Sequence, residues 1–349
     1  MRKVAIIGAG MMGSALAFPL RENGHIVNLV GTPLDDDIIS NCLKENKHLK
    51  FDRVFPAGIN FFYFKDWLEA VKDVDFVICG VSSFGVDWFL ENVLMKLDPS
   101  VPVLSVTKGL INKEEGTLIS YPDYWEGKLK EKGIIREVCA IGGPCTSYEL
   151  VFHDHSEVTF CGKNINVLKM MKDAMRTSYY HISLTDDVLG LESAVALKNG
   201  YALGIALTIG LSEKENGLDS GLHFNSQAGV FYQAVKEMKA LLRIQHASEL
   251  AECMGIGDLY VTVYGGRTRK IGILLGRGLS YKEAVEELKG VTLESLVVSR
   301  RVIEAIKVKA SKGIVDLNDF PLLMHIDGVL NKNKSAELPW DDFTFEKFI

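Results

Sequence analysis

The feature that most constrains this chain is a glycine motif near its N-terminus. The stretch KVAIIGAGMMGSALA places Gly8, Gly10 and Gly13 in G-x-G-x-x-G spacing, after an apolar run that predicts a strand over 3–7 and before a helix-like segment. The first glycine allows a tight turn, the second lets the backbone approach a pyrophosphate, and the third allows close helix–strand packing. The dipole and N–H groups of the helix N-terminus then favour phosphate. The motif therefore predicts a dinucleotide-binding domain.

The sequence gives no equally direct signal for the ribose of such a cofactor. Proteins that bind NAD usually carry Asp or Glu at the end of the second strand, about 20 residues after the glycines. Here residues 29–33 read LVGTP, with neither an acid nor an arginine. Asp35, Asp36 and Asp37 follow, but a run of three acids is typical of a solvated helix start. The pattern leaves the choice between NAD and NADP open.

The first half of the chain alternates short apolar runs with helix-like segments, which is the pattern of a parallel sheet with crossover helices. Helical apolar spacing is found at residues 13–22 and 86–97. The expected strands are 3–7, 26–30, 76–81, 103–106 and 138–141, with later runs at 157–161 and 181–184 extending the same sheet. We therefore expect an α/β, Rossmann-type, doubly wound sheet in this half.

The second half has a different character, because long Ala- and Leu-rich helical periodicity replaces the short strands after residue 186. The expected helices are 189–211, 226–254, 274–278, 281–288 and 293–310. A chain of 349 residues is about twice the length of a typical domain. We therefore expect a dinucleotide-binding domain at 1–186 and an all-α substrate and catalytic domain at 187–349. The polar tail after Lys332 is expected to be peripheral.

Composition narrows the class of partner. The net charge of −6 argues against nucleic acid or an anionic membrane as the main partner. No uninterrupted run of 18 apolar residues is present, so we expect no membrane span. The six cysteines form no CxxC pair and suit a reducing compartment, so we expect a cytoplasmic protein. We expect no metal site, because His153-Asp154-His155 has no matching second cluster and suits a surface turn.

Four stretches carry polar or glycine residues where chemistry could take place. Lys198 and Asn199 interrupt the apolar segment ALKNGYALGIAL, where a charge costs free energy unless it is paired or reaches water. Lys108 and Gly143 each follow a predicted strand, at the sheet edge where open α/β sheets bind ligands. The fourth stretch is GIGDLYVTVYGGRTRK, which contains Asp258, Thr262, Arg267, Thr268 and Arg269.

Each charged residue in these stretches also has a structural interpretation. Lys198 could reach the surface with its long side chain. Lys108 could be a solvent-facing lysine at a strand end. Asp258 could cap a helix that starts at Leu259. Arg267 could belong to a surface basic cluster, so no single stretch decides the function.

Together the stretches resemble one family. The patterns, in chain order, are GAGxxGxAL, S-x-x-K-G-L, G-P, G-x-E-x(5)-K-N, G-x-G-D-L-x-x-T and G-G-R-x-R, at residues 8–16, 105–110, 143–144, 190–199, 255–262 and 265–269. This order resembles the NAD(P)-dependent glycerol-3-phosphate dehydrogenase family. The resemblance implies reversible hydride transfer between NAD(P)H and a small phosphorylated substrate, dihydroxyacetone phosphate or sn-glycerol 3-phosphate. It also implies a homodimer, the state in which family members often occur.

The resemblance implies three catalytic residues. Lys198 is expected to donate the proton to the ketone oxygen and to accept it in the oxidation direction. Apolar surroundings can lower the pKa of its ammonium towards the working pH. Lys108 would be a second cation near the reacting carbon, and Asp258 would orient and charge-balance the two lysines. A cation beside the developing alkoxide stabilises it.

The resemblance also assigns substrate contacts. Arg267 would bind the phosphate, because its planar guanidinium matches phosphate oxygens. Thr268 stands beside it where the family usually has Asn, which puts its share of phosphate binding in doubt. Asn199 and Thr262 would position the substrate hydroxyls. The remaining substrate contacts implied are Gly143 and Cys145, the latter where many bacterial members have Ser.

The expected cofactor contacts begin with the glycine motif, where Met11 and Met12 would contribute backbone amides. Thr32 stands where several members carry Arg, which removes one partner for a ribose 2′-phosphate. The other cofactor contacts implied by the resemblance are Lys108, Ser147, Arg267 and Glu294.

Two other classes of protein fit parts of the pattern. A related two-domain 2-hydroxyacid, ketopantoate or sugar-acid reductase shares the glycine motif and a Lys-Asn pair. It does not need G-D-L followed by G-G-R-x-R, which suits a small phosphorylated ligand. A non-catalytic NAD(P)-binding sensor would be expected to have lost Lys198 or Asp258, and both are present.

Overall fold

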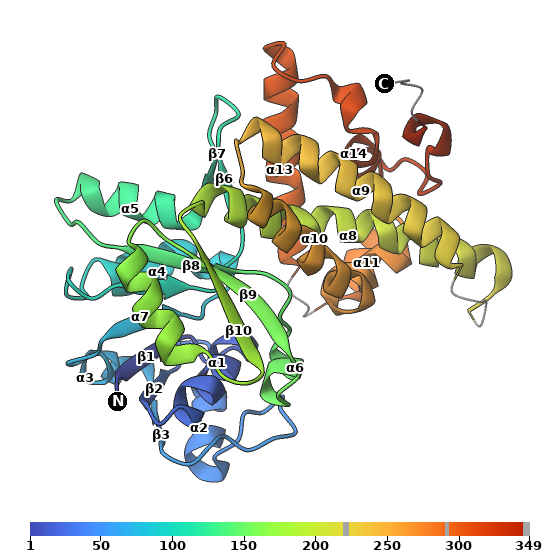
Figure 1. Ribbon diagram of the computed structural model, residues 1–349. Coiled ribbons are helices and arrows are strands. Elements are labelled where there is room, and N and C mark those ends of the chain that lie inside the picture. The colour runs from blue at the N-terminus through green and yellow to red at the C-terminus, as the bar shows by residue number, and fades with distance from the viewer. Residues whose placement is uncertain (219–222, 290–292, 345–349) are drawn as a thin grey trace. The chain divides into compact units, whose positions relative to one another are not determined.

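A computed structural model of the chain describes residues 1–218, 223–289 and 293–344. The chain divides into two compact units (Figure 1). The sheet unit comprises Met1–Gly109 and Ser120–Val188, and the helical unit comprises Leu110–Ile119 and Leu189–Ile349.

The sheet unit is built on an eight-stranded sheet with the order β10-β9-β8-β5-β4-β1-β2-β3. The strands are β1 (Lys3–Ile7), β2 (Ile26–Val30), β3 (Ile59–Phe62), β4 (Phe76–Cys79), β5 (Val103–Ser105), β8 (Val138–Gly142), β9 (Ser156–Cys161) and β10 (Tyr180–Thr185). Neighbouring strands pair in parallel, except β8 and β9, which are antiparallel. Each of the seven expected strands is present, and β3 is an additional one. The strand order confirms the expected Rossmann-type, doubly wound fold.

Helices cover both faces of this sheet. All four residues of β4 are buried, as are Val4 to Ile7 of β1, and such burial requires apolar cover on both sides. The expected helix over 86–97 changes at Leu90 from an α-helix to a π-helical turn, Leu90–Leu94. The α-helices of the unit are α1 (Met11–Glu22), α2 (Asp36–Glu45), α3 (Trp67–Ala70), α4 (Val86–Phe89), α5 (Tyr121–Glu131), α6 (Ser147–Val151) and α7 (Ile165–Met175).

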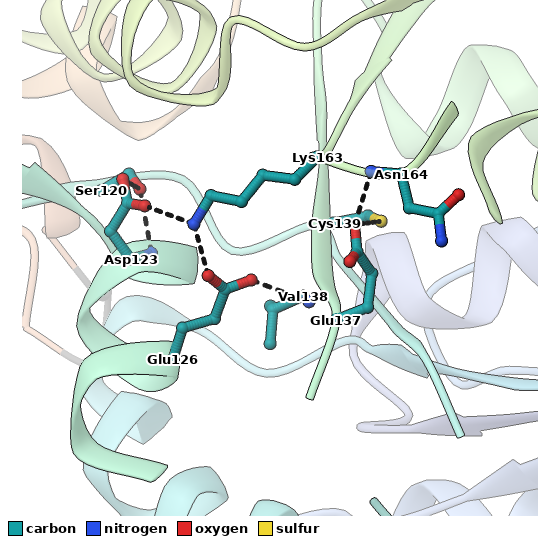
Figure 2. Close-up of polar contacts among 8 residues, drawn as sticks. All are labelled: Ser120, Asp123, Glu126, Glu137, Val138, Cys139, Lys163 and Asn164. Atoms are coloured by element: carbon teal, nitrogen blue, oxygen red, sulfur yellow. Dashed lines mark hydrogen bonds and ion pairs between the residues drawn. The ribbon is translucent and has the colours of Figure 1, made fainter. Parts of the chain in front are cut away.

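Where the chain re-enters the sheet unit, a polar network fixes the start of α5 (Figure 2). The Ser120 hydroxyl caps the helix by accepting the Asp123 N–H at 3.1 Å. Lys163 Nζ lies 3.3 Å from Asp123 Oδ1 and 2.5 Å from Glu126 Oε2. The other carboxylate oxygen of Glu126 accepts the N–H of Val138, the first residue of β8, at 3.2 Å. The network therefore aligns α5 with β8 and with the turn that follows β9.

The helical unit contains the α-helices that follow β10. They are α8 (Val188–Asn216), α9 (Phe224–Ile244), α10 (Glu249–Tyr264), α11 (Gly266–Gly276), α12 (Tyr281–Glu287), α13 (Glu294–Ser311) and α14 (Pro321–Lys332). The prediction of one helix over 226–254 is wrong. His246 adopts a left-handed φ of 56°, and the Ser248 hydroxyl accepts the Ala251 N–H at 3.3 Å to start α10. The helical spacing of apolar residues continues through this turn, so only the capping residue Ser248 marks the turn in the sequence.

A hairpin from the middle of the chain belongs to the helical unit. Its strands are β6 (Leu110–Asn112) and β7 (Leu118–Ser120), and Leu110 and Leu118 are buried in the core of the helical unit. Arg301 Nη1 of α13 donates to the Leu110 carbonyl, and Nζ of Lys312, the C-cap residue of α13, donates to the Glu115 carbonyl, each at 2.8 Å. Strands of three residues produce no shift in composition, so a boundary drawn from composition near residue 186 does not include this hairpin.

The long helix α8 is apolar and lies inside the helical unit. It is long and apolar enough to cross a membrane by length and composition, but 89% of its most apolar 18-residue window is buried within the protein. Glycine and alanine let other helices approach it closely: a Cβ on Gly272 of α11 would lie 2.6 Å from the Cβ of Ala206. The apolar sequence of α8 is therefore that of a core helix.

Candidate active site

The glycine motif forms an open turn between β1 and α1. A Cβ on Gly8 would lie 2.6 Å from the carbonyl carbon of Gly80, and a Cβ on Gly13 would lie 2.1 Å from the Gly8 oxygen. For a Cβ on Gly10 the nearest atom is the Gly80 oxygen, at 3.9 Å. Gly8 and Gly13 are therefore needed for packing, whereas Gly10 leaves space in front of the backbone. Its side of the turn fits the pyrophosphate of a dinucleotide.

The N-terminus of α1 adds to this fit. Gly10 is the N-cap residue and gives the helix no side-chain cap, and the first turn carries no acid. Met11 and Met12 begin the helix, as the sequence indicated. Their N–H groups belong to the first turn, whose amides have no partner within a helix. An anion such as a phosphate is stabilised at this position.

The Ala9 peptide groups inside this turn are held by Asp35, which was expected at a solvated helix start, and by His48, which was not singled out in the sequence. Asp35 Oδ2 accepts the Ala9 N–H at 3.2 Å. His48 Nδ1 accepts the Lys50 N–H at 3.0 Å, so its proton is on Nε2, which donates to the Ala9 carbonyl at 3.1 Å. Burial lowers the pKa of His48 below its ordinary value. The glycine turn is thus fixed by a carboxylate on one side and a neutral imidazole on the other.

The three consecutive acids Asp35, Asp36 and Asp37 therefore do not share one role. Asp36 and Asp37 are exposed in the first turn of α2, as expected for a solvated helix start. Asp35 instead turns back towards the end of β2, where its Oδ2 also accepts the N–H and the hydroxyl of Thr32, each at 2.8 Å. This arrangement places an acid beside the glycine turn, although none stands at the end of the second strand in the sequence.

A groove of about 470 Å³ lies alongside the glycine turn, within the sheet unit. Its wall is mostly apolar, with Phe84 61% exposed and Trp88 close by. Among the described residues, those that line it include no lysine and no arginine. They are Gly8, Gly10, Thr32, Pro33, Leu34, Asp35, Gly80, Val81, Ser82, Phe84, Gly85 and Trp88. A groove of this kind suits the flat, apolar faces of an adenosine.

Lys108 lies at the carboxyl edge of the sheet, as predicted. The residue before it, Thr107, donates its hydroxyl proton to the Val81 carbonyl at 2.8 Å, which fixes the loop after β5. Lys108 Nζ donates to the Gly143 carbonyl at 3.3 Å. Gly143 follows β8 with a φ of 128°, a conformation that favours glycine. Two of the predicted substrate contacts of the sheet unit are therefore adjacent.

Cys145 and Ser147 follow in the same loop. Cys145 is partly buried, and Ser147 is the first residue of α6, whose N-cap Thr146 accepts the Glu149 N–H at 3.4 Å. Both residues therefore lie in the chain shortly after Gly143, and Ser147 begins a short, capped helix.

Lys198 and Asp258 form a buried ion pair in the helical unit. Lys198 is 8% exposed and Asp258 is 1% exposed, and Lys198 Nζ donates to Asp258 Oδ1. Because Lys198 is buried, the interpretation in which it reaches the surface is wrong. Because Asp258 lies within α10, the interpretation in which it caps a helix is also wrong. A Cβ on Gly255 of α10 would lie 2.7 Å from the Cβ of Ala194 in α8. This close approach, one turn before the pair on both helices, lets the two charges meet.

The end of α10 leads directly into a second N-terminus. Thr262, one turn after Asp258, donates its hydroxyl proton to the Asp258 carbonyl at 2.7 Å. Gly265 is the N-cap of α11 and provides no side-chain cap, and the first turn holds no acid. Arg267 is exposed in that turn and Thr268 beside it is buried. Helix N–H groups next to a guanidinium suit an anion such as a phosphate.

Three further candidate residues are Asn199, Arg269 and Glu294. Asn199 is partly buried next to Lys198. Arg269, considered as part of a basic cluster, donates to the Val263 carbonyl at 3.2 Å and so caps the end of α10. The side chain of Glu294 lies outside the described residues, although α13 begins at this position.

Comparisons with known proteins agree with this arrangement. Residues 3–168 match the family described as NAD-dependent glycerol-3-phosphate dehydrogenase N-terminus, and residues 187–340 match its C-terminus. A protein of Archaeoglobus fulgidus named NADP(+)-dependent glycerol-3-phosphate dehydrogenase is 32% identical over 290 residues, 82% of this chain and 83% of that protein.

A glycerol-3-phosphate dehydrogenase [NAD(P)+] of Leuconostoc citreum is 29% identical over 96% of this chain and 94% of its own length. The crystal structure of glycerol-3-phosphate dehydrogenase from Coxiella burnetii has the same fold, with a TM-score of 0.79 at 21% identity over 96% of each chain. The alternative of a 2-hydroxyacid, ketopantoate or sugar-acid reductase is not favoured. The chain therefore belongs to the NAD-dependent glycerol-3-phosphate dehydrogenase family and is an NAD(P)-dependent oxidoreductase.

Proposed function

We propose that this chain catalyses reversible hydride transfer between NAD(P)H and dihydroxyacetone phosphate, forming sn-glycerol 3-phosphate. The observation that carries the proposal is the buried pair of Lys198 and Asp258 in the helical unit. A buried ion pair is expensive to form and adds little stability by itself. Its position within a helix of apolar residues is explained if the ammonium is needed for chemistry.

In this proposal Lys198 delivers the proton. When bound, NAD(P)H would supply the hydride for C2 of the ketone, and this chain would then have to stabilise the negative charge on the C2 oxygen. The Lys198 ammonium stabilises that oxygen and gives it a proton, and in the oxidation direction the neutral amine takes the proton back. Asp258 holds the ammonium in place and balances its charge.

Lys108 is proposed to add a second cation from the sheet unit, close to Gly143 and Cys145. In the helical unit, Asn199 and Thr262 are proposed to position the hydroxyls of the substrate. The hydroxyl proton of Thr262 is already donated to the Asp258 carbonyl, so its oxygen is suited to accept a hydrogen bond from the substrate.

The phosphate of the substrate is assigned to the start of α11. The Arg267 guanidinium and the uncapped N–H groups of the first turn supply positive charge and donors to the same place. Thr268 replaces the Asn usual in the family, and because its side chain is buried, its backbone amide is the donor we assign here. Arg267 is also proposed to contact the cofactor, with Ser147, Thr32 and Glu294.

The proposal is tested by replacing Lys198 with methionine, which keeps the length of the side chain and removes its charge. We expect turnover of dihydroxyacetone phosphate to fall roughly 10²- to 10⁴-fold, while NADH binding, measured by titration of its fluorescence, stays unchanged. Lys214→Met is the matched control, because Lys214 lies in the last turn of the same helix and is exposed. Normal turnover by Lys198→Met would refute this assignment.

Substrate identity is tested separately by comparing rates on dihydroxyacetone phosphate and on unphosphorylated 2-keto acids, with NADH and with NADPH. Arg267→Ala should raise the KM for the phosphorylated ketone, with Arg243→Ala in α9 as an exposed control. An unchanged KM would exclude Arg267 as the phosphate ligand. Activity on keto acids alone would favour the rival reductases.

We also propose that the chain is a cytoplasmic homodimer with a dinucleotide-binding domain at 1–186 and a substrate and catalytic domain at 187–349, the second completed by the hairpin of residues 110–119. The charge of −6 and the cysteine pattern support the location, and the family resemblance supports the dimer. Light scattering of the purified full chain measures its mass, and a monomeric mass would refute the dimer.

A further inference from the structure

Thr107, the residue before Lys108, joins the loops that follow β4 and β5. Its hydroxyl donates to the Val81 carbonyl at 2.8 Å, and its N–H donates to the Ser105 hydroxyl at 3.1 Å. Thr107 is only 3% exposed. Because buried polar groups cost free energy when they lose their partners, these contacts are hard to open. Thr107 therefore fixes the backbone from which the Lys108 side chain starts.

The thiol of Cys79, at the end of β4, makes a third contact with this residue. Cys79 Sγ lies 3.6 Å from Thr107 Oγ1. Burial raises the pKa of the Cys79 thiol to about 12, so the sulfur keeps its proton. Since the hydroxyl proton of Thr107 is donated to Val81, the thiol donates and the Thr107 oxygen accepts. The hydroxyl thus contacts the turn after β4 on both sides of Gly80.

This turn after β4 is also the one that packs against the glycine motif. A Cβ on Gly80 would lie 2.7 Å from the Gly8 oxygen, and the Gly80 N–H donates to the Ile7 carbonyl at 2.8 Å. Gly80 and Val81 line the groove beside the glycine turn. A continuous set of contacts therefore runs from the glycine turn through Gly80 and Val81 to Thr107.

The chain is held on the other side of Lys108 as well. A Cβ on Gly109 would lie 2.6 Å from Cε2 of Tyr121, which is buried. The next residue, Leu110, already belongs to the helical unit. Lys108 therefore lies between two fixed neighbours at the end of this segment of the sheet unit, and its Nζ donates to the Gly143 carbonyl at 3.3 Å.

We propose that Thr107 is a positioning residue, whose hydrogen bonds to Val81 and Cys79 hold the Lys108 ammonium at a fixed place relative to the glycine turn. A catalytic cation is effective only where charge develops, so a small displacement lowers the rate. Thr107 acts through Lys108, because its own hydroxyl is already used by Val81 and Cys79. The inference rests on the proposed function in that Lys108 serves the reaction as a cation.

The first test is Thr107→Val, which keeps the approximate volume of the side chain and replaces the hydroxyl by a methyl group. We expect kcat for dihydroxyacetone phosphate to fall roughly tenfold, while KM changes by less than about threefold. Thr107→Ser restores the hydroxyl and should recover most of the parent kcat. An unchanged kcat in Thr107→Val, or no recovery in Thr107→Ser, would overturn the proposal.

Thr208→Val in α8 is the matched control. Thr208 is also buried, and its hydroxyl donates to the Ile205 carbonyl at 2.7 Å. The control therefore loses a buried hydroxyl of the same kind in the helical unit, and we expect its kcat to stay at the parent value. An equal loss of kcat in Thr208→Val would mean that any buried hydroxyl has this effect, and the proposal would be wrong.

The route through Lys108 is tested by combining two changes. Lys108→Met removes the ammonium, so in that background Thr107→Val should lower kcat no further. Losses that multiply in the double variant would show that Thr107 acts by another route, which contradicts the proposal.

A measurement without substrate separates this inference from the proposed function. Acetic anhydride acetylates Lys108 Nζ and releases acetate, and mass spectrometry of peptides from the full chain gives the rate. We expect Thr107→Val to raise this rate at least about threefold, because a looser loop frees Nζ from the Gly143 carbonyl more often. Thr208→Val should leave the rate unchanged.

Ser105→Ala is a second variant, in case Thr107→Val folds poorly. It removes the acceptor of the Thr107 N–H and should raise the labelling rate of Lys108 in the same direction. An unchanged rate in both variants would overturn the inference. Faster labelling in a chain whose parent does not turn over dihydroxyacetone phosphate would support the inference and refute only the proposed function.

Discussion

In the sheet unit, the candidate cofactor site is made mainly of backbone groups held by glycines that lie within a few residues of one another. In the helical unit, the candidate catalytic pair is made of side-chain charges 60 residues apart, brought together by two packed helices. The first site needs open space and N–H groups, and a change there acts through backbone geometry. The second needs matched charges in an apolar environment, and a change there acts through desolvation.

The sharpest test of the helical unit is Asp258→Asn. This change leaves the Lys198 ammonium buried beside a neutral amide, so we expect a loss of roughly 3–5 kcal/mol in the free energy of unfolding, together with nearly complete loss of turnover. Urea denaturation and steady-state rates measure the two effects. Asp319→Asn, at an exposed position, is the control.

The double variant Lys198→Met with Asp258→Leu separates the two effects. We expect it to recover most of the lost stability, because no charge stays buried, and to remain inactive. Recovery of turnover in the double variant would contradict a role of the pair in catalysis.

For the sheet unit, the matched comparison is Gly13→Ala with Gly10→Ala. The Cβ on Gly13 would lie 2.1 Å from the Gly8 oxygen, so we expect a loss of about 3 kcal/mol or more in stability. At Gly10 the Cβ would make only an ordinary contact, 3.9 Å from the Gly80 oxygen, so stability should change by only about 0.5 kcal/mol while NADH affinity falls. Thermal unfolding and NADH titration measure both, and equal stability losses would contradict the division of roles.

The stability of the folded protein is expected to depend on pH through Glu237 of the helical unit. Its carboxylate accepts the N–H groups of Leu322 and Leu323 in the first turn of α14, at 2.7 and 2.9 Å. Burial raises the pKa of Glu237 from 4.5 to about 7, and the hydrogen bonds oppose this shift. The folded protein thus keeps a proton that the unfolded chain loses. This stabilisation is complete below about pH 4.5 and is lost as the pH rises through about 7.

The expected loss is about 2.5 kcal/mol between pH 5 and pH 8. Glu237→Gln, which cannot ionise, should remove this part of the pH dependence, and Glu304→Gln at an exposed position should not. Urea denaturation across this pH range measures the free energy of unfolding of each variant. A slope that persists in Glu237→Gln would assign it to another group.

The smallest effect is expected at His48. His48→Asn shortens the side chain, so that it no longer reaches the Ala9 carbonyl, and we expect the Kd of NADH to rise about 3- to 10-fold. His246→Asn is the control, since His246 is exposed and asparagine tolerates its left-handed backbone. An unchanged Kd in His48→Asn would show that the glycines alone determine the turn.

The same contrast explains which parts of the structure could be predicted from the sequence. The β1–glycine–α1 unit is local, so its period and its glycines predict it well. The four residues of β3 and the three-residue strands of the hairpin are too short for a period to show. The separation of α9 from α10 depends on one serine cap within a continuous apolar pattern.

Among the site residues, Lys198 attracts notice as a charge in an apolar helix, but nothing in the spacing links it to Asp258. Only the family resemblance joined them. Asp35 was set aside as part of a solvated helix start and His48 was not singled out, because the role of each depends on a side chain that turns back onto Ala9 from 26 or 39 residues away. Contacts of this kind require the tertiary structure.

The hairpin of residues 110–119 has a consequence for how the protein can be produced in pieces. Its leucines belong to the helical core, and Arg301 and Lys312 bind its carbonyls. During synthesis the ribosome makes this hairpin well before α13 exists, so the helical core is completed only when its last helices reach back to an early segment. A gene fragment that encodes only 189–349 would lack part of its own core. Expression of the helical unit alone therefore requires that the hairpin be grafted onto it.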